Sequence, residues 1–324
     1  MINLKLIRAA GSDPRENLAL EATLMEQCKP GEMILYLWQN DHTVVIGRNQ
    51  NPWKECNMTQ IEKDGVTLVR RPSGGGAVYH DLGNLNFTFL TEDAFFSKER
   101  QAQVVCDALA TLGITAQFSG RNDLLVEGKK FSGNAYHHSK GFSSQHGTLL
   151  IDSNLTMMPR YLNPDPEKLK AKGVDSVRSR VTNLKVFQPG LTVGQVADAL
   201  VRACEREYNS IASPIDSVDT QRVAEWTKHF SDPKWTLGVQ SNFDISWAHR
   251  FSWGDITLEL DVHEGVIQDV RIYSDAMDTQ WIETIKDCLK GCPYSVGAMT
   301  DSLQHLAKDE QTIELIDWIQ AQET

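Results

Sequence analysis

Apolar residues recur along the chain with two different spacings, and together these predict an α+β protein. A helical spacing of three and four residues marks several segments. They are residues 14–27, 101–112, 192–208, 220–229, 279–290 and 308–321, with a shorter polar helix at 57–64. The spacing of Thr192 and Gln195 predicts a capping box at the start of the helix over residues 192–208. Apolar or alternating runs typical of strands lie between these helical segments. They begin at Leu4 and continue at residues 33–38, 43–47, 66–70, 77–80, 84–90, 123–126, 130–136, 148–151, 255–263 and 266–273.

The order of these elements favours an antiparallel or mixed sheet, because strands follow one another as hairpins and do not alternate with helices. One hairpin is predicted from residues 33–38 and 43–47, which four polar residues separate. A second hairpin joins residues 123–126 to residues 130–136 through a Gly-Lys turn. The larger part of the chain is therefore expected to form one α+β domain.

A change of pattern after residue 243 predicts a second, smaller α+β domain. Residues 255–263 alternate strictly between apolar and polar, a Glu-Gly turn leads into the next strand, and two helices would cover the apolar face. The charge changes at the same place, since residues 246–324 contain 15 acidic and 5 basic residues and carry −10 of the total charge of −11. We therefore expect domains over residues 1–245 and 246–324.

Composition and charge exclude several classes of protein. The chain of 324 residues has 43 acidic and 32 basic residues, and this acidic excess disfavours a broad nucleic-acid-binding surface. No apolar run approaches the roughly 18 residues of a membrane span, and the first residues lack the apolar core of a signal peptide. Six scattered cysteines are too few for a disulfide scaffold. We expect a cytoplasmic protein without nucleic-acid or membrane partners.

The strongest chemical signal is the segment 70–81, which contains two arginines, three consecutive glycines and a His-Asp pair. Without side chains at Gly74, Gly75 and Gly76, backbone N–H groups can approach an anion or a flat group closely, and the arginines can neutralise an anion. No Gly-Lys-Ser or Gly-Lys-Thr follows, so this is not a Walker A loop. The alternative is a glycine-rich surface turn.

A second signal is a lysine at the start of a predicted strand. The period of two places Lys130, Ser132 and Asn134 on one face, with Phe131 and Ala135 on the other. A lysine fixed in this way can hold its ammonium near a developing oxyanion or a phosphate. A solvated surface charge is the alternative.

Two further segments carry chemical signals. The sequence His-Gly-Thr at residues 146–148 leads into an apolar strand, and residues 163–185 carry an excess of three positive charges. The basic segment is either a solvated loop or a surface that docks a partner or faces phosphate, and the residues alone leave both open.

The order of these motifs resembles that of lipoate–protein ligase A. The matching segments are residues 44–48, 51–57, 70–81, 120–124, 130–133, 146–148 and 176–184. The resemblance extends over essentially the whole chain, including a small C-terminal domain that some relatives lack. It implies a catalytic domain over residues 1–245 with a fold like that of the biotin and lipoate ligases, and an accessory domain over residues 246–324.

The resemblance implies a two-step reaction. Free lipoate, or octanoate, and MgATP give enzyme-bound acyl-adenylate and pyrophosphate, and a lysine of an apo lipoyl domain then attacks the adenylate. The acceptors implied are the lipoyl domains of 2-oxoacid dehydrogenase complexes and the glycine-cleavage H protein. This chemistry suits the residues, because a carboxylate attacking a phosphate needs cations and backbone donors to offset the repulsion.

The resemblance also assigns site residues, all of them in the predicted catalytic domain. The residues implied to hold ATP are Arg71, Gly76, Ala77, Val78 and Tyr79, together with Lys130, which would contact both the α-phosphate and the lipoyl carbonyl as the catalytic residue. The residues implied to border lipoate are Gly74, Gly75, His80 and Trp38. Asp123 is a candidate Mg²⁺ ligand, since hard cations take oxygen ligands but few from the protein.

Three alternatives remain to be distinguished. An ATP-independent octanoyl or lipoyl transferase of similar fold needs a nucleophilic cysteine, and none lies in the glycine-rich, Lys130 or His146 segments. A biotin ligase would carry a Gly-Arg-Gly-Arg type of loop, which is absent. A non-catalytic lipoate-binding or scaffold protein would not need both Arg71 and Lys130. Pyrophosphate release that depends on lipoate separates all of these.

Overall fold

The computed structural model describes residues 2–120, 122–163, 181–238 and 243–322. The chain forms two compact units. The first unit comprises Met1–Ile46, Pro52–Pro72 and Ala77–Leu237. The second comprises Gly47–Asn51, Ser73–Gly76 and Gly238–Thr324. Two short loops from early in the sequence thus belong with the C-terminal residues, and the predicted boundary between residues 245 and 246 stays a prediction.

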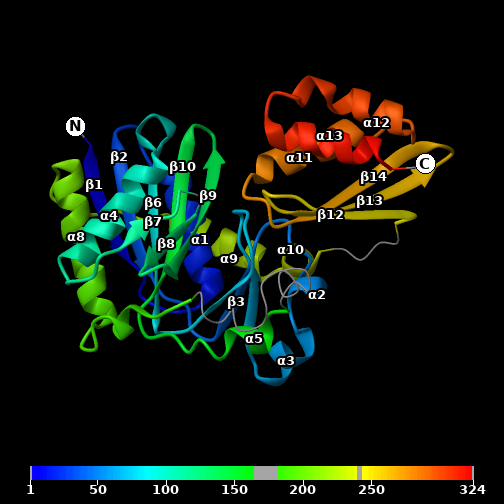
Figure 1. Cartoon of the computed structure of the whole chain (residues 1–324). Helices are drawn as coiled ribbons and strands as arrows, with labels where there is room; N and C mark the ends of the chain where they lie inside the picture. The colour runs from blue at the N-terminus through cyan, green and yellow to red at the C-terminus, as the bar shows by residue number, and fades with distance from the viewer. Residues whose placement is uncertain (1, 121, 164–180, 239–242, 323–324) are drawn as a thin grey trace. The chain divides into compact units, whose positions relative to one another are not determined.

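An eight-stranded mixed sheet forms the centre of the first unit (Figure 1). Its order is β11 (Ser213–Pro214), β1 (Asn3–Arg8), β2 (Glu32–Trp38), β6 (Asn84–Glu92), β10 (Phe142–Leu150), β9 (Lys129–Ser139), β8 (Asp123–Val126) and β7 (Gln117–Phe118). Strand β1 pairs in parallel with both neighbours, and the other pairs are antiparallel. The predicted α+β class with a mixed sheet is therefore confirmed.

Helices cover both faces of this sheet. On one face, α4 (Lys98–Ala110) and α8 (Val193–Tyr208) pack their apolar sides against β2, β6 and β10. On the other, α1 (Pro14–Gln27) and α9 (Thr220–Ser231) form a second apolar cluster with β2. Helix α8 begins with the predicted capping box, in which Thr192 and Gln195 each satisfy the other's backbone N–H.

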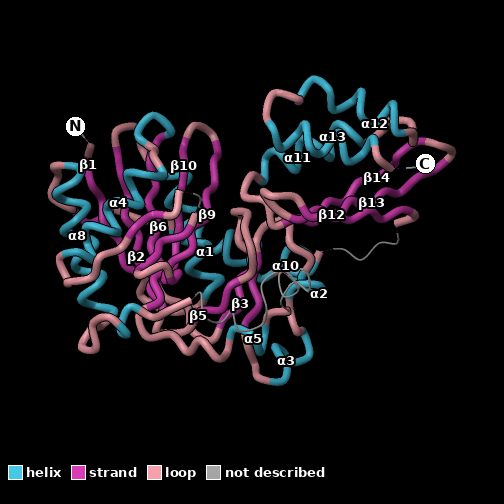
Figure 2. Tube along the Cα trace, in the orientation of Figure 1, coloured by secondary structure: helices cyan, strands magenta, loops and turns pink. Residues whose placement is uncertain are grey.

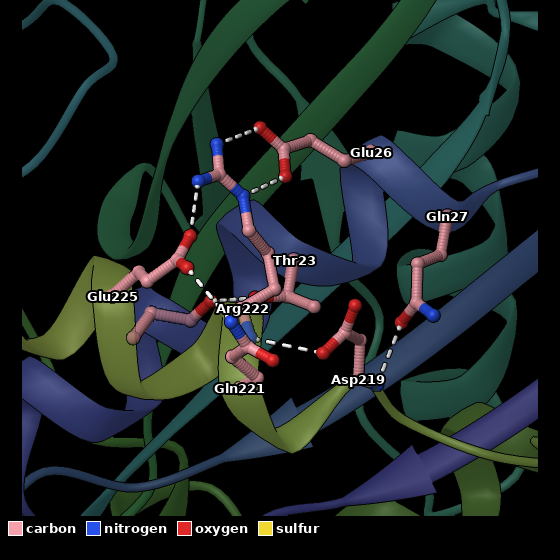
Figure 3. Close-up of polar contacts among 8 residues, drawn as sticks. Thr23, Glu26, Gln27, Asp219, Gln221, Arg222 and Glu225 are labelled. Atoms are coloured by element: carbon pink, nitrogen blue, oxygen red, sulfur yellow. Dashed lines mark hydrogen bonds and ion pairs between the residues drawn. The ribbon is translucent and has the colours of Figure 1, made fainter.

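Helix α1 is joined to α9 by a polar contact at its C-terminal end (Figure 3). The Arg222 guanidinium donates two hydrogen bonds to Glu26, at 2.6 and 2.8 Å, and a third to Glu225 at 2.7 Å. The backbone N–H of Asp219, the N-cap of α9, donates to the Gln27 side chain at 3.3 Å. Exposed ion pairs stabilise little, but this paired geometry fixes the register of α1 against α9.

A second, three-stranded sheet in the first unit corrects the prediction of a hairpin over residues 33–38 and 43–47. Strand β3 (Thr43–Ile46) lies between β4 (Thr67–Arg70), which is parallel to it, and β5 (Val78–His80), which is antiparallel. Strand β2 lies in the large sheet instead. Every residue of β3 and all but the first of β2 are buried, so each strand needs cover on both faces, which a two-stranded hairpin does not provide.

The second unit contains an antiparallel sheet with helices on its apolar face (Figure 2). The sheet order is β12 (Ile245–Arg250), β13 (Asp255–His263) and β14 (Val266–Ser274), and the helices are α11 (Thr279–Leu289), α12 (Val296–Leu303) and α13 (Glu310–Gln320). The predicted Glu-Gly turn is present, with positive φ at Glu264 and Gly265. Strand β12 and helix α12 were not predicted.

Short helices complete the described parts of the chain. They are α2 (Pro52–Glu55), α3 (Met58–Lys63), α5 (Met158–Tyr161), α10 (Pro233–Leu237) and the 3₁₀ turns Asp93–Phe95, Leu184–Val186 and Gln304–Leu306. Helix α3 corresponds to the polar helix expected at residues 57–64. Among the helices described, none has both the length and the apolar character that a membrane crossing requires.

Candidate active site

One face of the large sheet gathers several of the residues singled out in the sequence. Thr88 of β6 lies opposite Tyr36 of β2 and opposite His146 of β10. Paired residues share a face and alternate residues along a strand return to it, so Trp38, Thr88 and His146 point to the same side. This is the side that α1 covers.

The same face carries Lys130 and Asp123 at its far end. Asp123 pairs with Gly133 and Leu125 pairs with Lys130, and the Lys130 Nζ lies 2.7 Å from the Asp123 Oδ1. An ideal Cβ at Gly133 would lie 3.0 Å from that Nζ, so the glycine leaves room for the ammonium. The Lys130 carbonyl accepts a hydrogen bond from the Thr182 N–H at 2.9 Å, which holds the backbone in place.

The register of this hairpin corrects the predicted grouping of Lys130 with Ser132. A shift between Leu124 and Leu125 makes Ser132 pair with Leu124, whose side chain belongs to the apolar cluster on the opposite face. Phe131 is the extra residue, and the alternation therefore breaks beside Lys130. Ser132 faces the core, where the Asn134 side chain donates to it at 3.5 Å.

A chain of buried hydrogen bonds on the α1 side of the sheet links four elements, β2, β6, β10 and α1. The Trp38 Nε1 donates to the Thr88 hydroxyl at 3.0 Å, and this hydroxyl donates to a carboxylate oxygen of Glu21 at 2.6 Å. The His146 Nδ1 lies 2.9 Å from the same carboxylate. Glu21 comes from α1 and is only 5% exposed. Burial by itself raises its pKa, but the charge of His146 and the hydrogen bonds from His146 and Thr88 outweigh burial and lower it.

Glu21 is a buried charged residue of this face that the sequence motifs did not single out. The available signal was its position, because a glutamate three residues after Leu18 and three before Leu24 lies on the apolar stripe of that helix. A charge in such a place needs a partner inside the protein. The sequence could have indicated that a partner exists, but not that it is His146.

The two arginines at the end of β4, Arg70 in the strand and Arg71 just after it, have different surroundings. Arg71 is buried, its N–H donates to the Ile46 carbonyl at 3.0 Å, and its guanidinium donates to the Val45 carbonyl at 3.4 Å. Burial lowers the pKa of Arg71 to about 10, while the nearby charge of Glu21 opposes this, so Arg71 remains a cation at neutral pH. The Arg70 side chain donates to two backbone carbonyls of α10, those of Trp235 at 3.0 Å and Thr236 at 2.8 Å, and these bonds hold α10.

In the second unit, the glycine-rich loop packs against the segment that follows β14. An ideal Cβ on Gly74 would lie 2.4 Å from the Ala276 carbonyl oxygen and 2.6 Å from that of Met277. Gly75 has a φ of +89°, and its N–H donates to the Ala276 carbonyl at 3.3 Å. Gly76 has no heavy atom within 4 Å of its ideal Cβ. Two of the three glycines are thus required by packing or backbone conformation.

Replacing Gly74 by alanine is expected to displace this loop. The clashing atoms are backbone carbonyls, which cannot rotate away, so the Gly75–Ala276 hydrogen bond should weaken. Amide hydrogen exchange would report this as faster exchange at Gly75, by about tenfold for a loss of 1.4 kcal/mol. Gly76→Ala is the matched control, because its methyl group has space. Equal protection of Gly75 in both variants would contradict the packing argument.

Most of the remaining predicted residues lie on β5 or directly before it. His80 and Tyr79 lie on β5, which is an edge strand of the described small sheet, and Ala77 and Val78 precede them. The Tyr79 hydroxyl lies 3.2 Å from the His42 Nδ1, and the two rings meet edge to face. The His80 ring is buried and meets the edge of the Trp38 ring, with centroids 6.5 Å apart.

The structure gives little evidence on two predictions, the basic segment 163–185 and the Mg²⁺ ligand Asp123. Most of the basic segment 163–185 lies outside the described residues. Asp123 already binds Lys130, and no group of three or more His, Cys, Asp or Glu side chains suited to a metal occurs among the described residues. Asp123 therefore fits Mg²⁺ only as a single protein ligand, with the other positions filled by phosphate and water.

Comparisons with known proteins agree along the length of the chain. A family model described as the lipoyl protein ligase A/B catalytic domain matches residues 13–205, and one described as the bacterial lipoate protein ligase C-terminus matches residues 240–319. The crystal structure of P. falciparum LipL1 in complex with lipoate is 27% identical, with a TM-score of 0.87, and the match covers 99% of this chain and 100% of that one.

Two further structures match the larger part of the chain. A bi-partite lipoate protein ligase of Thermoplasma acidophilum, described with its E2 lipoyl domain, is 26% identical with a TM-score of 0.64, covering 75% of this chain and 99% of that one. A lipoate-protein ligase A bound with ATP is 24% identical with a TM-score of 0.63, covering 74% and 99%, and its likeness concerns the fold.

Proposed function

This chain belongs to the lipoyl protein ligase A/B catalytic-domain family, and from that premise we propose that it is an ATP-dependent lipoate–protein ligase. It would activate lipoate, or octanoate, to the acyl-adenylate and then transfer the acyl group to a lysine of an apo lipoyl domain. The observation that supports this most directly is the ammonium of Lys130, held on the sheet face by Asp123 at 2.7 Å. A reaction that consumes ATP and a free acid suits the cytoplasm.

In the first step, a carboxylate oxygen of the acid attacks the α-phosphorus of ATP and pyrophosphate leaves. Two anions must approach, so a fixed cation lowers the barrier. Lys130 would supply it, exchanging part of its contact with Asp123 for the α-phosphate oxygen and the acyl carbonyl. Arg71 is a second cation and would bind nucleotide phosphate, and the backbone N–H groups of Gly76, Ala77, Val78 and Tyr79 are also assigned to the nucleotide.

The acyl chain needs an apolar environment. Trp38 belongs to an apolar cluster with Leu18, Tyr36 and Val45, and His80 contacts its ring. We assign Trp38 and His80 to the acyl tail, and Gly74 and Gly75 to its border. Mg²⁺ would neutralise charge on the phosphates of ATP, and Asp123 is the residue proposed to reach it.

In the second step, the amine of the acceptor lysine attacks the acyl carbonyl and AMP leaves. Lys130 would again stabilise the carbonyl oxygen as negative charge develops. The acceptors proposed are the lipoyl domains of 2-oxoacid dehydrogenase complexes and the glycine-cleavage H protein. The description of the Thermoplasma relative with an E2 lipoyl domain is compatible with such a partner.

A transferase mechanism through a cysteine has less support. Among the described residues of the first unit, the cysteines are buried, and burial raises the pKa of both Cys28 and Cys56 to about 12. A thiol with such a pKa is not a nucleophile at neutral pH.

Pyrophosphate release tests the proposed function. We expect release that requires both ATP and lipoate, and lipoyl transfer, seen as a mass increase of the carrier, when an apo lipoyl domain is added. A lipoyl domain whose acceptor lysine is replaced by arginine is the control for transfer. Release without lipoate, or acyl transfer without ATP, would exclude the ligase mechanism.

A further inference from the structure

A row of buried polar side chains in the first unit ends at one ring nitrogen of His80. Its members are Tyr36, Asn17, Asn40 and His80, all of them buried. Only one assignment of hydrogen-bond donors along this row is consistent with the contacts, and it fixes the tautomer of His80.

The orientation of Asn17 is set by a backbone carbonyl. Its side-chain Nδ2 lies 2.8 Å from the Gln39 carbonyl oxygen, which can only accept. The Asn17 amide nitrogen must therefore point there, and its Oδ1 accepts from the Tyr36 hydroxyl at 3.1 Å. Burial, with the nearby charge of Glu21, raises the pKa of Tyr36 well above its usual value, so this hydroxyl keeps its proton.

The orientation of the Asn17 amide determines that of the Asn40 amide, and this determines which nitrogen of His80 carries the proton. The second N–H of Asn17 donates to the Asn40 Oδ1 at 3.0 Å, so the Nδ2 of Asn40 faces the His80 Nδ1 at 3.2 Å. An amide nitrogen is a donor, and the His80 Nδ1 must accept. Burial lowers the pKa of His80 to about 3, with the charge of Arg71 adding to the effect, so the ring is neutral and its proton is on Nε2.

The Nε2–H of His80 is a buried donor without a protein partner among the described residues. Such groups are rare because leaving a buried donor unpaired is costly. The His80 ring meets the Trp38 ring, with centroids 6.5 Å apart, and we assign Trp38 to the acyl tail. The structure thus holds a neutral donor of fixed orientation, with the ring of Trp38 and the charge of Arg71 nearby.

We propose that the Nε2–H of His80 donates a hydrogen bond to a ring sulfur of bound lipoate and thereby selects lipoate over octanoate. This inference rests on the proposed function. Octanoate has the same number of carbons along its chain but ends in a methyl group, which cannot accept. Binding octanoate would bury the N–H unpaired, whereas the disulfide ring of lipoate presents a weak acceptor. Asn17 and Asn40 are positioning residues that hold the donor in this orientation.

Two substitutions at His80 test the roles of its two ring nitrogens separately. In His80→Gln the amide nitrogen can occupy the place of Nε2 and keep a donor there, whereas His80→Asn reaches only the place of Nδ1. Using full-length protein, kcat/KM for pyrophosphate release is measured with lipoate and with octanoate. We expect the octanoate-to-lipoate ratio to rise about tenfold in His80→Asn and to stay within about twofold of the native ratio in His80→Gln.

The results of these measurements distinguish failure of the His80 inference from failure of the proposed ligase function. An unchanged ratio in both variants, or an equal rise in both, overturns the role of the Nε2–H while the native enzyme still supports the ligase. No release by the native protein with either acid overturns the proposed function and this inference with it.

Nitrogen-15 spectra of the native protein give a second measurement if a variant does not fold. They should show His80 as the Nε2–H tautomer, with a shift of this nitrogen on adding lipoate that octanoate does not produce. The Nδ1–H tautomer, or equal shifts with both acids, would overturn the inference.

Discussion

Lys130→Ala should reduce the rate of acyl-adenylate formation by about 10³-fold, with little change in the free energy of unfolding. The ammonium lies on the sheet face, 2.7 Å from Asp123, and no other described lysine pairs with that carboxylate. Loss of one fixed charge that stabilises a developing anion typically costs a factor of 10² to 10³. Pyrophosphate release and single-turnover transfer from preformed lipoyl-adenylate should both fall, because the proposal gives Lys130 a role in each step.

The neighbouring lysine provides the matched control. Lys129 is exposed and pairs across the hairpin with Val126, and Lys129→Ala should leave both rates unchanged. The register shift in this hairpin places Lys130 on the same face as Asp123 and Ser132 on the opposite face. The effect of the substitution is therefore expected at Lys130 alone. If Lys129→Ala lost adenylation and Lys130→Ala kept it, the assignment of the catalytic lysine would be wrong.

Glu21→Gln should lower the free energy of unfolding by about 3 kcal/mol. Glu21 is buried between His146 and the hydroxyl of Thr88, and its charge also acts on the buried guanidinium of Arg71. Glutamine keeps the size and the accepting oxygen but removes the charge, so a buried cation loses its compensation. Urea denaturation monitored by tryptophan fluorescence measures the change.

Glu26 is an exposed glutamate on the same helix, so its substitution is the control for the effect of burial. It forms an exposed ion pair with Arg222, so Glu26→Gln should cost less than about 1 kcal/mol. A loss for Glu21→Gln no larger than that for Glu26→Gln would show that the buried carboxylate does not stabilise the fold.

The pH dependence of stability should identify Glu21 directly. Its folded pKa lies below the ordinary value of 4.5, so its contribution is complete above pH 4.5 and is lost as the pH falls through the folded pKa. The native protein should therefore lose stability below pH 4.5 more steeply than Glu21→Gln. Parallel slopes in the two proteins would contradict a lowered pKa.

Features coded by neighbouring residues were predictable from the sequence. The capping box of Thr192 and Gln195, the hairpin that carries Lys130 and the Glu264-Gly265 turn are confirmed, because each depends on residues a few positions apart. The turn of the Lys130 hairpin lies one residue earlier than predicted, at Glu127-Gly128, and Lys129 already belongs to β9. The family inferred from the order of the motifs is confirmed as well. The roles of individual site residues stay predictions until they are measured.

Features that depend on distant residues were not predictable. Apolar periodicity showed that residues 33–38 and 43–47 are buried, but not that they enter different sheets. It gave no sign of the irregularity between Leu124 and Leu125, which reverses the face of Ser132. Tertiary packing decides these points, because burial alone does not specify which neighbour provides it.

The membership of the glycine-rich loop in the second unit has a consequence for biosynthesis. The Gly75 N–H donates to the carbonyl of Ala276, and the Ser274 N–H donates to the carbonyl of Asn49. Each bond joins a loop made early in translation to residues made late. These loops therefore acquire their final hydrogen bonds only after residues 274–277 have left the ribosome, when most of the first unit has already been synthesised. A nascent chain stalled before that point would have its lysine-bearing hairpin complete but its glycine-rich loop unsupported.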